Sequence, residues 1–274
     1  MSTTAPADAS TYRFARPTVG DVMRDMHIPA GDLGPGDNVP DFDLPTLDHA
    51  RFSSGQFDGS GRPTLIVFGS LTCPITESAG AGLVALHERY GEEIRFVVVN
   101  TREAHPGEAI PQPSTFDEKR AHAANLRAHH RFDFEVAVDD IDGTVHRAFG
   151  TRPSSAYLVD ADGTILFRAH WSNVTGALEE ALAATAAGRP VPTVTAAQTS
   201  RAIAKMIGHA GDALDDAGPG AMRDTWLVAP PFAAMIRFSR LFAFMPKDRR
   251  GLPTIAAMSA IAVGLIALLA RTIG

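Results

Sequence analysis

The residue best suited to chemistry is Cys73, which is the one cysteine of the 274-residue chain. An apolar run over residues 65–68 precedes it, Pro74 follows it, and apolar residues then recur at helical spacing as far as Tyr90. These patterns predict Cys73 at the junction between a buried strand and a helix. A thiol at a helix N-terminus faces unpaired backbone N–H groups and the positive end of the helix dipole. Both favour the thiolate and can lower the pKa from about 8.5 to roughly 3.5–7.5.

The spacing around Cys73 limits the reactions open to it. A dithiol mechanism needs a second sulfur, usually three residues on, where this chain has Thr76, so disulfide exchange within the protein is excluded. The Thr76 hydroxyl could donate a hydrogen bond to the thiolate or cap the helix. The thiolate could attack a peroxide oxygen and become a sulfenic acid, or attack a halogen on an organic substrate. Either reaction needs an external thiol as reductant, and no bound cofactor is expected.

Acid–base groups are predicted beside this thiol. The run 95–100 is a second buried strand, and the residues after it, 101–115, contain prolines and no periodicity, which indicates a long loop. Glu103 and His105 lie at the start of this loop, at the sheet edge where open α/β sheets carry their ligand crevice. His105 could donate a proton to a leaving group and Glu103 could orient His105. Most such pairs are surface residues, and that alternative stays open, as does a buried Cys73 acting as a small hydrophobe.

The order of elements predicts an α/β fold with a thioredoxin-like mixed sheet flanked by helices. Strands and helices alternate over 37–188, and a final hairpin over 156–168 turns at an Asp-Gly pair, so parallel strands gain an antiparallel edge. Residues 1–36 are expected to be mostly flexible, with one helical turn near 19–26. Residues 189–250 are expected to be a linker with amphipathic helices, one of them running from Ile203 to Leu214.

The C-terminal residues 251–274 are predicted to be a transmembrane anchor. The run 252–270 is nineteen residues without a charge, and about twenty apolar residues span a bilayer as a helix. Lys247, Arg249 and Arg250 precede the run and only Arg271 follows it. This bias predicts a single-pass membrane protein whose N-terminal domain lies in the cytoplasm. An unpaired cysteine suits that compartment, and no signal peptide is recognisable at the N-terminus.

Composition excludes some other functions. The net charge of −6 gives no reason to expect nucleic acid as a partner. No Gly-rich phosphate loop follows a strand. His122, His129 and His130 lie on or near one helix without a His-x-x-x-His pair, so we expect a solvated helix face and no metal site. The sequence leaves the oligomeric state open, with a homodimer among the options.

Three separated segments resemble the iodothyronine deiodinase family, with cysteine in place of selenocysteine. They are 68–74 (Phe-Gly-Ser-Leu-Thr-Cys-Pro), 102–106 (Arg-Glu-Ala-His-Pro) and the stretch from 138 through 153 and 157–159. The resemblance implies a thioredoxin fold, reductive removal of iodine and a thiol cosubstrate. It also implies Cys73 as nucleophile with Glu103 and His105 as catalytic groups. Around them we assign substrate contacts to Thr72, Thr76, Arg152 and Pro153.

The chain departs from that family at two contact positions. Ser155 stands where the family has an arginine, for which Arg152 is a substitute, and Pro113 stands where a histidine is expected. The broader peroxiredoxin group is also similar: 39–44 (Val-Pro-Asp-Phe-Asp-Leu) matches its entry segment. Ser70 matches its active-site pattern, although Ile66 occupies the proline position.

Three functions therefore remain open. The main prediction is a deiodinase-like, thiol-dependent reductase acting on a small molecule. A peroxiredoxin-like thiol peroxidase is the alternative enzyme. The third alternative is a membrane-tethered, redox-sensing or binding module in which Cys73 is oxidised only occasionally.

Overall fold

A five-stranded mixed sheet forms the centre of the molecule. In this computed structural model, the described residues are 12–26, 31–192, 195 and 198–273. The strand order is β5-β4-β3-β6-β7, with β3, β4 and β5 parallel and β6 and β7 antiparallel to their neighbours. The strands are β3 (Thr64–Gly69), β4 (Arg95–Asn100), β5 (Glu135–Val138), β6 (Ala156–Val159) and β7 (Ile165–Ala169). The thioredoxin-like mixed sheet predicted from the sequence is confirmed.

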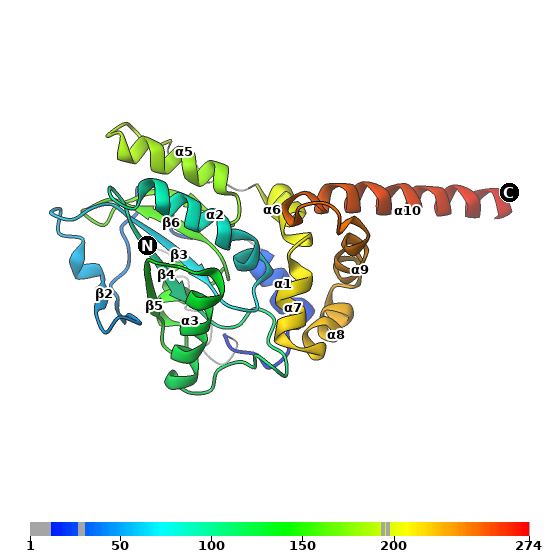
Figure 1. The fold of residues 1–274 in the computed structure, drawn as a ribbon, viewed down its shortest axis with the longest axis horizontal. Coiled ribbons are helices and arrows are strands. Elements are labelled where there is room, and N and C mark those ends of the chain that lie inside the picture. The colour runs from blue at the N-terminus through cyan, green and yellow to red at the C-terminus, as the bar shows by residue number, and fades with distance from the viewer. Residues whose placement is uncertain (1–11, 27–30, 193–194, 196–197, 274) are drawn as a thin grey trace.

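Alternate residues of each strand supply two apolar cores, one on each face of the sheet. Helices α2 (Pro74–Tyr90), α3 (Phe116–His130) and α5 (Thr175–Ala186) cover one face, where Leu65 and Val98 point. The other face, where Ile66 and Val99 point, is covered by three further elements. These are α4 (Thr144–Phe149) and the antiparallel pair β1 (Asp43–Pro45) and β2 (Arg51–Ser53), and a short 3-10 turn, η2 (Ser54–Gln56), follows β2. Figure 1 shows α2 and α3 on the sheet.

Residues 12–26 are packed on this domain, which differs from the flexible segment expected over 1–36. The helix α1 (Val19–Met26) is eight residues long, and Tyr12 is 4% exposed. The Tyr12 hydroxyl lies 2.8 Å from His146 Nδ1, and Arg102 donates to Asp25 at 2.7 Å. These long-range contacts fix residues 12–26 on the domain, although the composition of this segment alone indicates disorder. The remainder of that expectation, over residues 1–11 and 27–30, falls outside the described residues.

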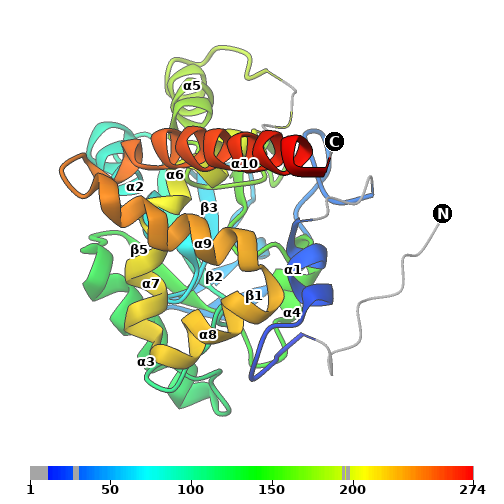
Figure 2. The same ribbon diagram turned by 90° about the vertical axis from the view of Figure 1, so that its right-hand side faces the viewer.

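Four short helices follow the domain and pack on it. They are α6 (Thr199–Ile207), α7 (Ala210–Ala217), α8 (Pro219–Val228) and α9 (Pro230–Ser239). The prediction of a single helix from Ile203 to Leu214 is wrong, because the chain turns at Gly208 between α6 and α7. A Cβ there would lie 2.0 Å from the Lys247 carbonyl oxygen, so this close approach needs glycine. Figure 2 shows α6 to α9 gathered over one end of the sheet.

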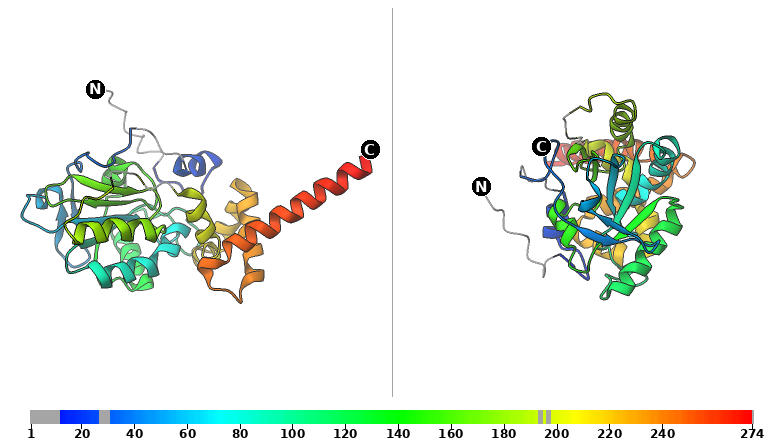
Figure 3. Two further views of the ribbon diagram at one scale, coloured as in Figure 1. Left: turned by 90° about the horizontal axis from the view of Figure 1, so that it is seen from above. Right: turned by 90° about the vertical axis from the view of Figure 1, so that its left-hand side faces the viewer.

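The last helix, α10 (Gly251–Ile273), leaves the body of the molecule after two 3-10 turns, η3 (Arg240–Phe242) and η4 (Lys247–Arg249). Figure 3 shows it projecting away from the domain. The helical stretch Lys247–Arg271 is long and apolar enough to cross a membrane, and only 6% of its most apolar 18 residues are buried. A core helix would be mostly buried, so the exposure is consistent with the anchor predicted from the sequence.

Candidate functional site

Cys73 is the N-cap residue of α2, at the strand–helix junction that the sequence predicts. The backbone N–H groups of Thr76 and Ile75 and the Thr76 hydroxyl face its sulfur and stabilise the thiolate. However, the side chain is only 2% exposed, and burial outweighs these hydrogen bonds, so the pKa of the thiol is raised. The lowered pKa expected from the sequence is therefore wrong. The sequence could not indicate this burial, which depends on the N-terminal segment and on helices more than a hundred residues further along the chain.

Cys73 lines a mostly apolar pocket of about 320 Å³, called here the covered pocket. Its wall includes His105 and Ala104 from the long loop, Pro153 from the segment before β6, and Trp171 after β7. The rest comes from both ends of the chain: Phe14, Pro17, Asp21, Val22, Asp25, Met26, Pro74, Ile75, Ile203, Met206, Thr225, Val228, Ala229, Phe232 and Met235. Helices α6, α8 and α9 and the N-terminal segment thus pack on the domain and cover the thiol.

Glu103 is fully buried and fixes the loop to the turn that carries the cysteine. Its Oε2 accepts hydrogen bonds from the backbone N–H of Thr72 at 2.9 Å and from the Thr72 hydroxyl at 2.7 Å. Its Oε1 lies 2.9 Å from His122 Nδ1. Glu103 does not line the covered pocket. Glu103 is therefore a positioning residue that acts through Thr72. The sequence predicted that its carboxylate orients His105, but the carboxylate is hydrogen-bonded to Thr72 and His122.

His105 faces the covered pocket together with Cys73. Its backbone N–H donates to the Thr72 hydroxyl oxygen at 3.0 Å, so Thr72 joins the loop, Glu103 and the cysteine turn. Burial and the nearby Arg102 guanidinium lower the pKa of His105 to about 4, so the ring is neutral at pH 7. Its Nδ1 is buried without a hydrogen-bond partner among the described residues. A neutral imidazole in this position can accept or donate one proton.

The four residues assigned to substrate contact fall in different places. Pro153 lines the covered pocket, and the described residues contain no cis peptide bond there or elsewhere. Thr72 and Thr76 are buried beneath it, and Thr76 Oγ1 accepts from the backbone N–H of Ser70 at 3.4 Å, so it does not cap the helix. Arg152 lies away from the pocket and forms an ion pair with Asp32. The structure therefore brings only Pro153 of these four to the pocket wall.

Three supporting residues had no recognisable signal in the sequence. Gln112 Oε1 accepts from the Glu103 N–H at 2.7 Å, and its Nε2 donates to the Glu103 carbonyl oxygen at 3.1 Å. Arg102 is buried and pairs with Asp25, which lines the covered pocket. Burial raises the pKa of the Asp25 carboxyl, although Arg102 opposes this.

The histidines predicted to form a solvated helix face are mostly buried. His122 is bonded to Glu103, and the side chain of His130 is 7% exposed. His129 is 41% exposed, and its Nε2 lies 2.7 Å from Glu77 Oε2 on α2. Glu77 lies 52 residues earlier in the chain, so the sequence spacing of the histidines could not indicate this contact.

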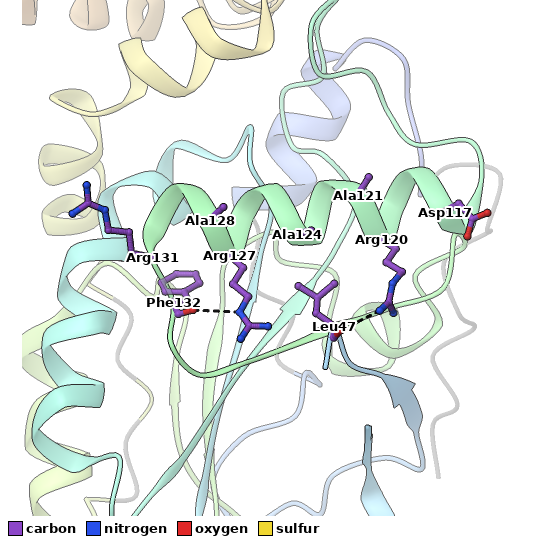
Figure 4. Close-up of a pocket in the computed structure, with 9 residues that line it drawn as sticks. All are labelled: Leu47, Asp117, Arg120, Ala121, Ala124, Arg127, Ala128, Arg131 and Phe132. Carbon is purple, nitrogen blue, oxygen red and sulfur yellow. Dashed lines mark hydrogen bonds between the residues drawn. The ribbon is translucent and has the colours of Figure 1, made fainter. Parts of the chain in front are cut away.

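A second pocket, of about 730 Å³, lies on the outer side of α3 and is shown in Figure 4. Arg120 and Arg127 line it, but both guanidinium groups are engaged. Arg120 donates to the Leu47 carbonyl oxygen at 3.0 Å, and Arg127 pairs with Asp48 at 2.6 Å. Neither Cys73 nor His105 contributes to this pocket, so the covered pocket is the candidate active site.

The AhpC/TSA family model matches residues 35–168, which include the whole of β3, the cysteine turn and the loop. This part of the chain is similar to the AhpC/TSA family. The match agrees with the thioredoxin-like fold and gives no specific support for the deiodinases. No curated protein matches the sequence significantly.

Several solved structures are similar to parts of this chain at low identity. An uncharacterised conserved protein from Geobacillus kaustophilus is 20% identical, with 62% of this chain and 93% of that chain covered and a TM-score of 0.47. Peroxidoxin BcpB from Mycobacterium tuberculosis is 19% identical, with 57% and 99% covered and a TM-score of 0.43. A secreted disulfide oxidoreductase from the same organism is 18% identical, with 46% and 80% covered and a TM-score of 0.36.

Proposed function

We propose that this protein is a peroxiredoxin-like thiol peroxidase in which Cys73 reduces a peroxide bound in the covered pocket. The observation that carries the proposal is that Cys73 and His105 line one pocket at the N-terminus of α2, inside the AhpC/TSA region. The similarity of residues 35–168 to the AhpC/TSA family supports redox chemistry at a thiol. The presence of a single cysteine favours a reaction that needs only one sulfur.

In the first half-reaction, the Cys73 sulfur attacks one oxygen of the peroxide bond. An S–O bond forms, the O–O bond breaks, and the second oxygen leaves as an alcohol or water. The thiol proton passes to neutral His105, which returns a proton to the departing oxygen. The backbone N–H groups of Thr76 and Ile75 stabilise the sulfur while it carries negative charge. Cys73 is left as a sulfenic acid.

In the second half-reaction, an external thiol attacks the sulfenic sulfur and releases water, leaving a mixed disulfide. A second thiol then attacks this disulfide, so that Cys73 is restored and the two external sulfurs leave joined as a disulfide. The chain has no other cysteine to resolve the intermediate, so the reductant must supply both sulfur atoms.

The lining of the pocket favours an organic peroxide. Trp171, Ile203, Met206 and Phe232 present apolar surface, which gains free energy by contact with an alkyl or aryl group. The polar side chains on the wall include the carboxyl groups of Asp21 and Asp25. Negative charge there disfavours anionic substrates.

Reductive dehalogenation is a second candidate, favoured by the same apolar pocket and by His105 on the wall that the thiol also lines. Here the sulfur attacks iodine on an aromatic ring, the C–I bond breaks, and the ring carbon takes a proton from His105. An external thiol then displaces iodide from sulfur to give a mixed disulfide. This chemistry follows from the sequence resemblance and uses the same two side chains.

We further propose that α10 anchors the enzyme in a membrane with the thioredoxin-like domain in the cytoplasm. The exposed apolar helix supports the anchor, and Lys247, Arg249 and Arg250 immediately before it support the orientation.

The test is turnover by the full-length chain in detergent micelles with dithiothreitol as reductant. Cumene hydroperoxide, hydrogen peroxide and an iodinated phenol are supplied separately, and peroxide loss or iodide release is measured. We expect consumption of cumene hydroperoxide that Cys73→Ser abolishes. Iodide release without peroxide consumption would replace the peroxidase by the dehalogenase. If neither peroxide consumption nor iodide release exceeds the Cys73→Ser background, the redox-sensing or binding module would be the remaining function.

A further inference from the structure

Apart from the cysteine, the structure assembles a group of metal-binding side chains from two helices. Glu77 in the first turn of α2 meets His129 and His130 at the end of α3, and one potential ligand atom of each lies within 4.8 Å of the other two. Glu77 Oε2 is central: it lies 2.7 Å from His129 Nε2 and 3.9 Å from His130 Nε2. We propose that these three side chains bind a divalent transition-metal ion, with Zn²⁺ as the best match.

The donor set supports this assignment. Two imidazole nitrogens and one carboxylate oxygen are ligands that Zn²⁺ accepts in a tetrahedral site, with water as the fourth ligand. Bonds of roughly 2.1 Å in a tetrahedron separate the ligand atoms by about 3.4 Å. The two measured separations of 2.7 and 3.9 Å lie on either side of this value. A small side-chain movement would therefore place all three atoms around one ion.

The ring of His130 is held in place before any ion arrives. It stacks on Phe132 with 5.1 Å between ring centroids, and its Nδ1 edge lies against Gly80, where a Cβ would be only 2.2 Å away. Glycine at position 80 therefore makes room for the ring, one turn after Glu77 on the same helix. Glu77 and His130 are also largely buried, with side-chain exposures of 12% and 7%. Such packing reduces the entropy lost when the ligands are fixed on a metal.

A bound ion would join α2 to α3 near the redox centre. The backbone N–H of Glu77 donates to the carbonyl oxygen of Cys73 at 2.9 Å, so Glu77 belongs to the turn that carries the thiol. The site is nevertheless separate from the covered pocket, because Glu77, His129 and His130 are absent from its wall. The inference is independent of the proposed peroxidase activity.

The experiment is a Zn²⁺ titration by calorimetry on the full-length chain in detergent, prepared without a polyhistidine tag, with thermal unfolding followed in parallel. We expect one Zn²⁺ per chain and a higher melting temperature in its presence. Glu77→Gln and His130→Ala are each expected to weaken binding about tenfold or more. His49→Asn is the matched control, because His49 is exposed, lies outside the group, and has a φ of 60° that asparagine tolerates.

Cys73→Ser separates this site from adventitious binding to the thiol, and it is expected to keep full Zn²⁺ affinity. Glu77→Gln keeps the shape of the side chain, so its result stands even where His130→Ala fails to fold. The proposal is overturned when Zn²⁺ does not bind, when Glu77→Gln binds as tightly as the unaltered chain, or when Cys73→Ser abolishes binding. In that case the three side chains form only a hydrogen-bonded ion pair.

Discussion

At the scale of single residues, two opposing effects act on the sulfur of Cys73. The N-terminus of α2 stabilises the thiolate through backbone N–H groups, while burial stabilises the neutral thiol, and burial is the larger effect. The thiol is therefore protonated at neutral pH, and the proposed reaction requires a group that accepts its proton. We propose His105, a neutral imidazole on the pocket wall, as this base, and Glu103 connects the loop to the cysteine turn through Thr72.

Alkylation of Cys73 measures this balance. Because the pKa is raised, the rate of reaction with iodoacetamide is expected to increase with pH through a midpoint above about 8.5, the value of an unperturbed thiol. The same shift makes the folded state hold its proton more tightly than the unfolded chain, so this contribution to stability is complete below about pH 8.5 and is lost at higher pH. A midpoint below about 7.5 would contradict the argument from burial.

Replacing the buried carboxylate tests its positioning role. Glu103→Gln is expected to destabilise the fold by about 1–3 kcal/mol, because one of the groups that donate to the carboxylate then faces an amide N–H₂. It is also expected to reduce peroxide turnover while the alkylation midpoint of Cys73 stays unchanged, since Glu103 does not line the covered pocket. Urea unfolding and steady-state assays measure the two effects. A shifted midpoint would show that Glu103 acts on the sulfur directly.

At the scale of elements, the loop 101–115 is the piece that connects the sheet to the C-terminal helices. The backbone N–H of Ala109 donates to the Ala217 carbonyl oxygen at 2.9 Å, and the Gly220 N–H donates to Glu108 at 2.7 Å. The loop therefore fixes both His105 and the helices that cover the thiol. Its length and prolines predicted a functional loop, whereas its docking on α7 and α8 could not be anticipated.

Gly107→Ala tests this docking. A Cβ at Gly107 would lie 2.2 Å from the Ala217 carbonyl oxygen, so we expect a loss of about 1–3 kcal/mol in stability and faster alkylation of Cys73 at a fixed pH. Gly176→Ala is the matched control, because the same added methyl group meets nothing within 4 Å on α5. Equal alkylation rates in the two variants would mean that the helices cover the thiol independently of the loop.

The sequence was most informative about local structure and least informative about contacts between its ends. Hydrophobic periodicity predicted the order of strands and helices from β3 to α5, and the Cys73–Pro74 pair marked the start of α2. The amphipathic pattern near Met206 predicted a helix but not its packing partner. In the structure this helix packs in a cluster of apolar residues that includes Cys73. Glu103 was recognised as a candidate, but its partners Thr72 and His122 are 31 and 19 residues away.

At the scale of the whole molecule, the N-terminal segment 12–26 and helices α6, α8 and α9 cover Cys73, and α10 extends from this same side of the molecule (Figure 1). Residues from 259 to 271 are all exposed, whereas Thr254 is buried against the body. The first turns of α10 thus belong to the folded unit and the remainder does not.

Ending the chain after Met258 is therefore expected to keep the fold and to abolish membrane attachment. Carbonate extraction of cell membranes should recover the full-length chain in the pellet and the shortened chain in the supernatant. A shortened chain that stays in the pellet would show that the helices before α10 bind the membrane.

Acid is expected to destabilise the whole molecule. Burial lowers the pKa of His105, His130 and His170 to about 4 and that of His146 to about 3. The unfolded chain takes up these protons below about pH 6.5, so this stability is complete above pH 6.5 and is lost as the pH falls toward 4. Each histidine contributes up to about 1.4 kcal/mol per pH unit, opposed in part by the raised pKa values of two buried carboxyl groups. The urea midpoint is expected to be lower at about pH 5 than at about pH 7. Equal midpoints would contradict the conclusion that these histidines are buried and neutral.

The central claim is that Cys73 becomes a sulfenic acid when an organic peroxide enters the covered pocket. The most direct measurement is intact-mass analysis of the full-length chain after one equivalent of cumene hydroperoxide, with dimedone present to trap sulfenic acid. We expect one dimedone adduct per chain, located on Cys73, formed by the folded protein and reduced in amount by His105→Ala. A thiol that remains unmodified while the protein is folded, and reacts only after unfolding, would contradict it.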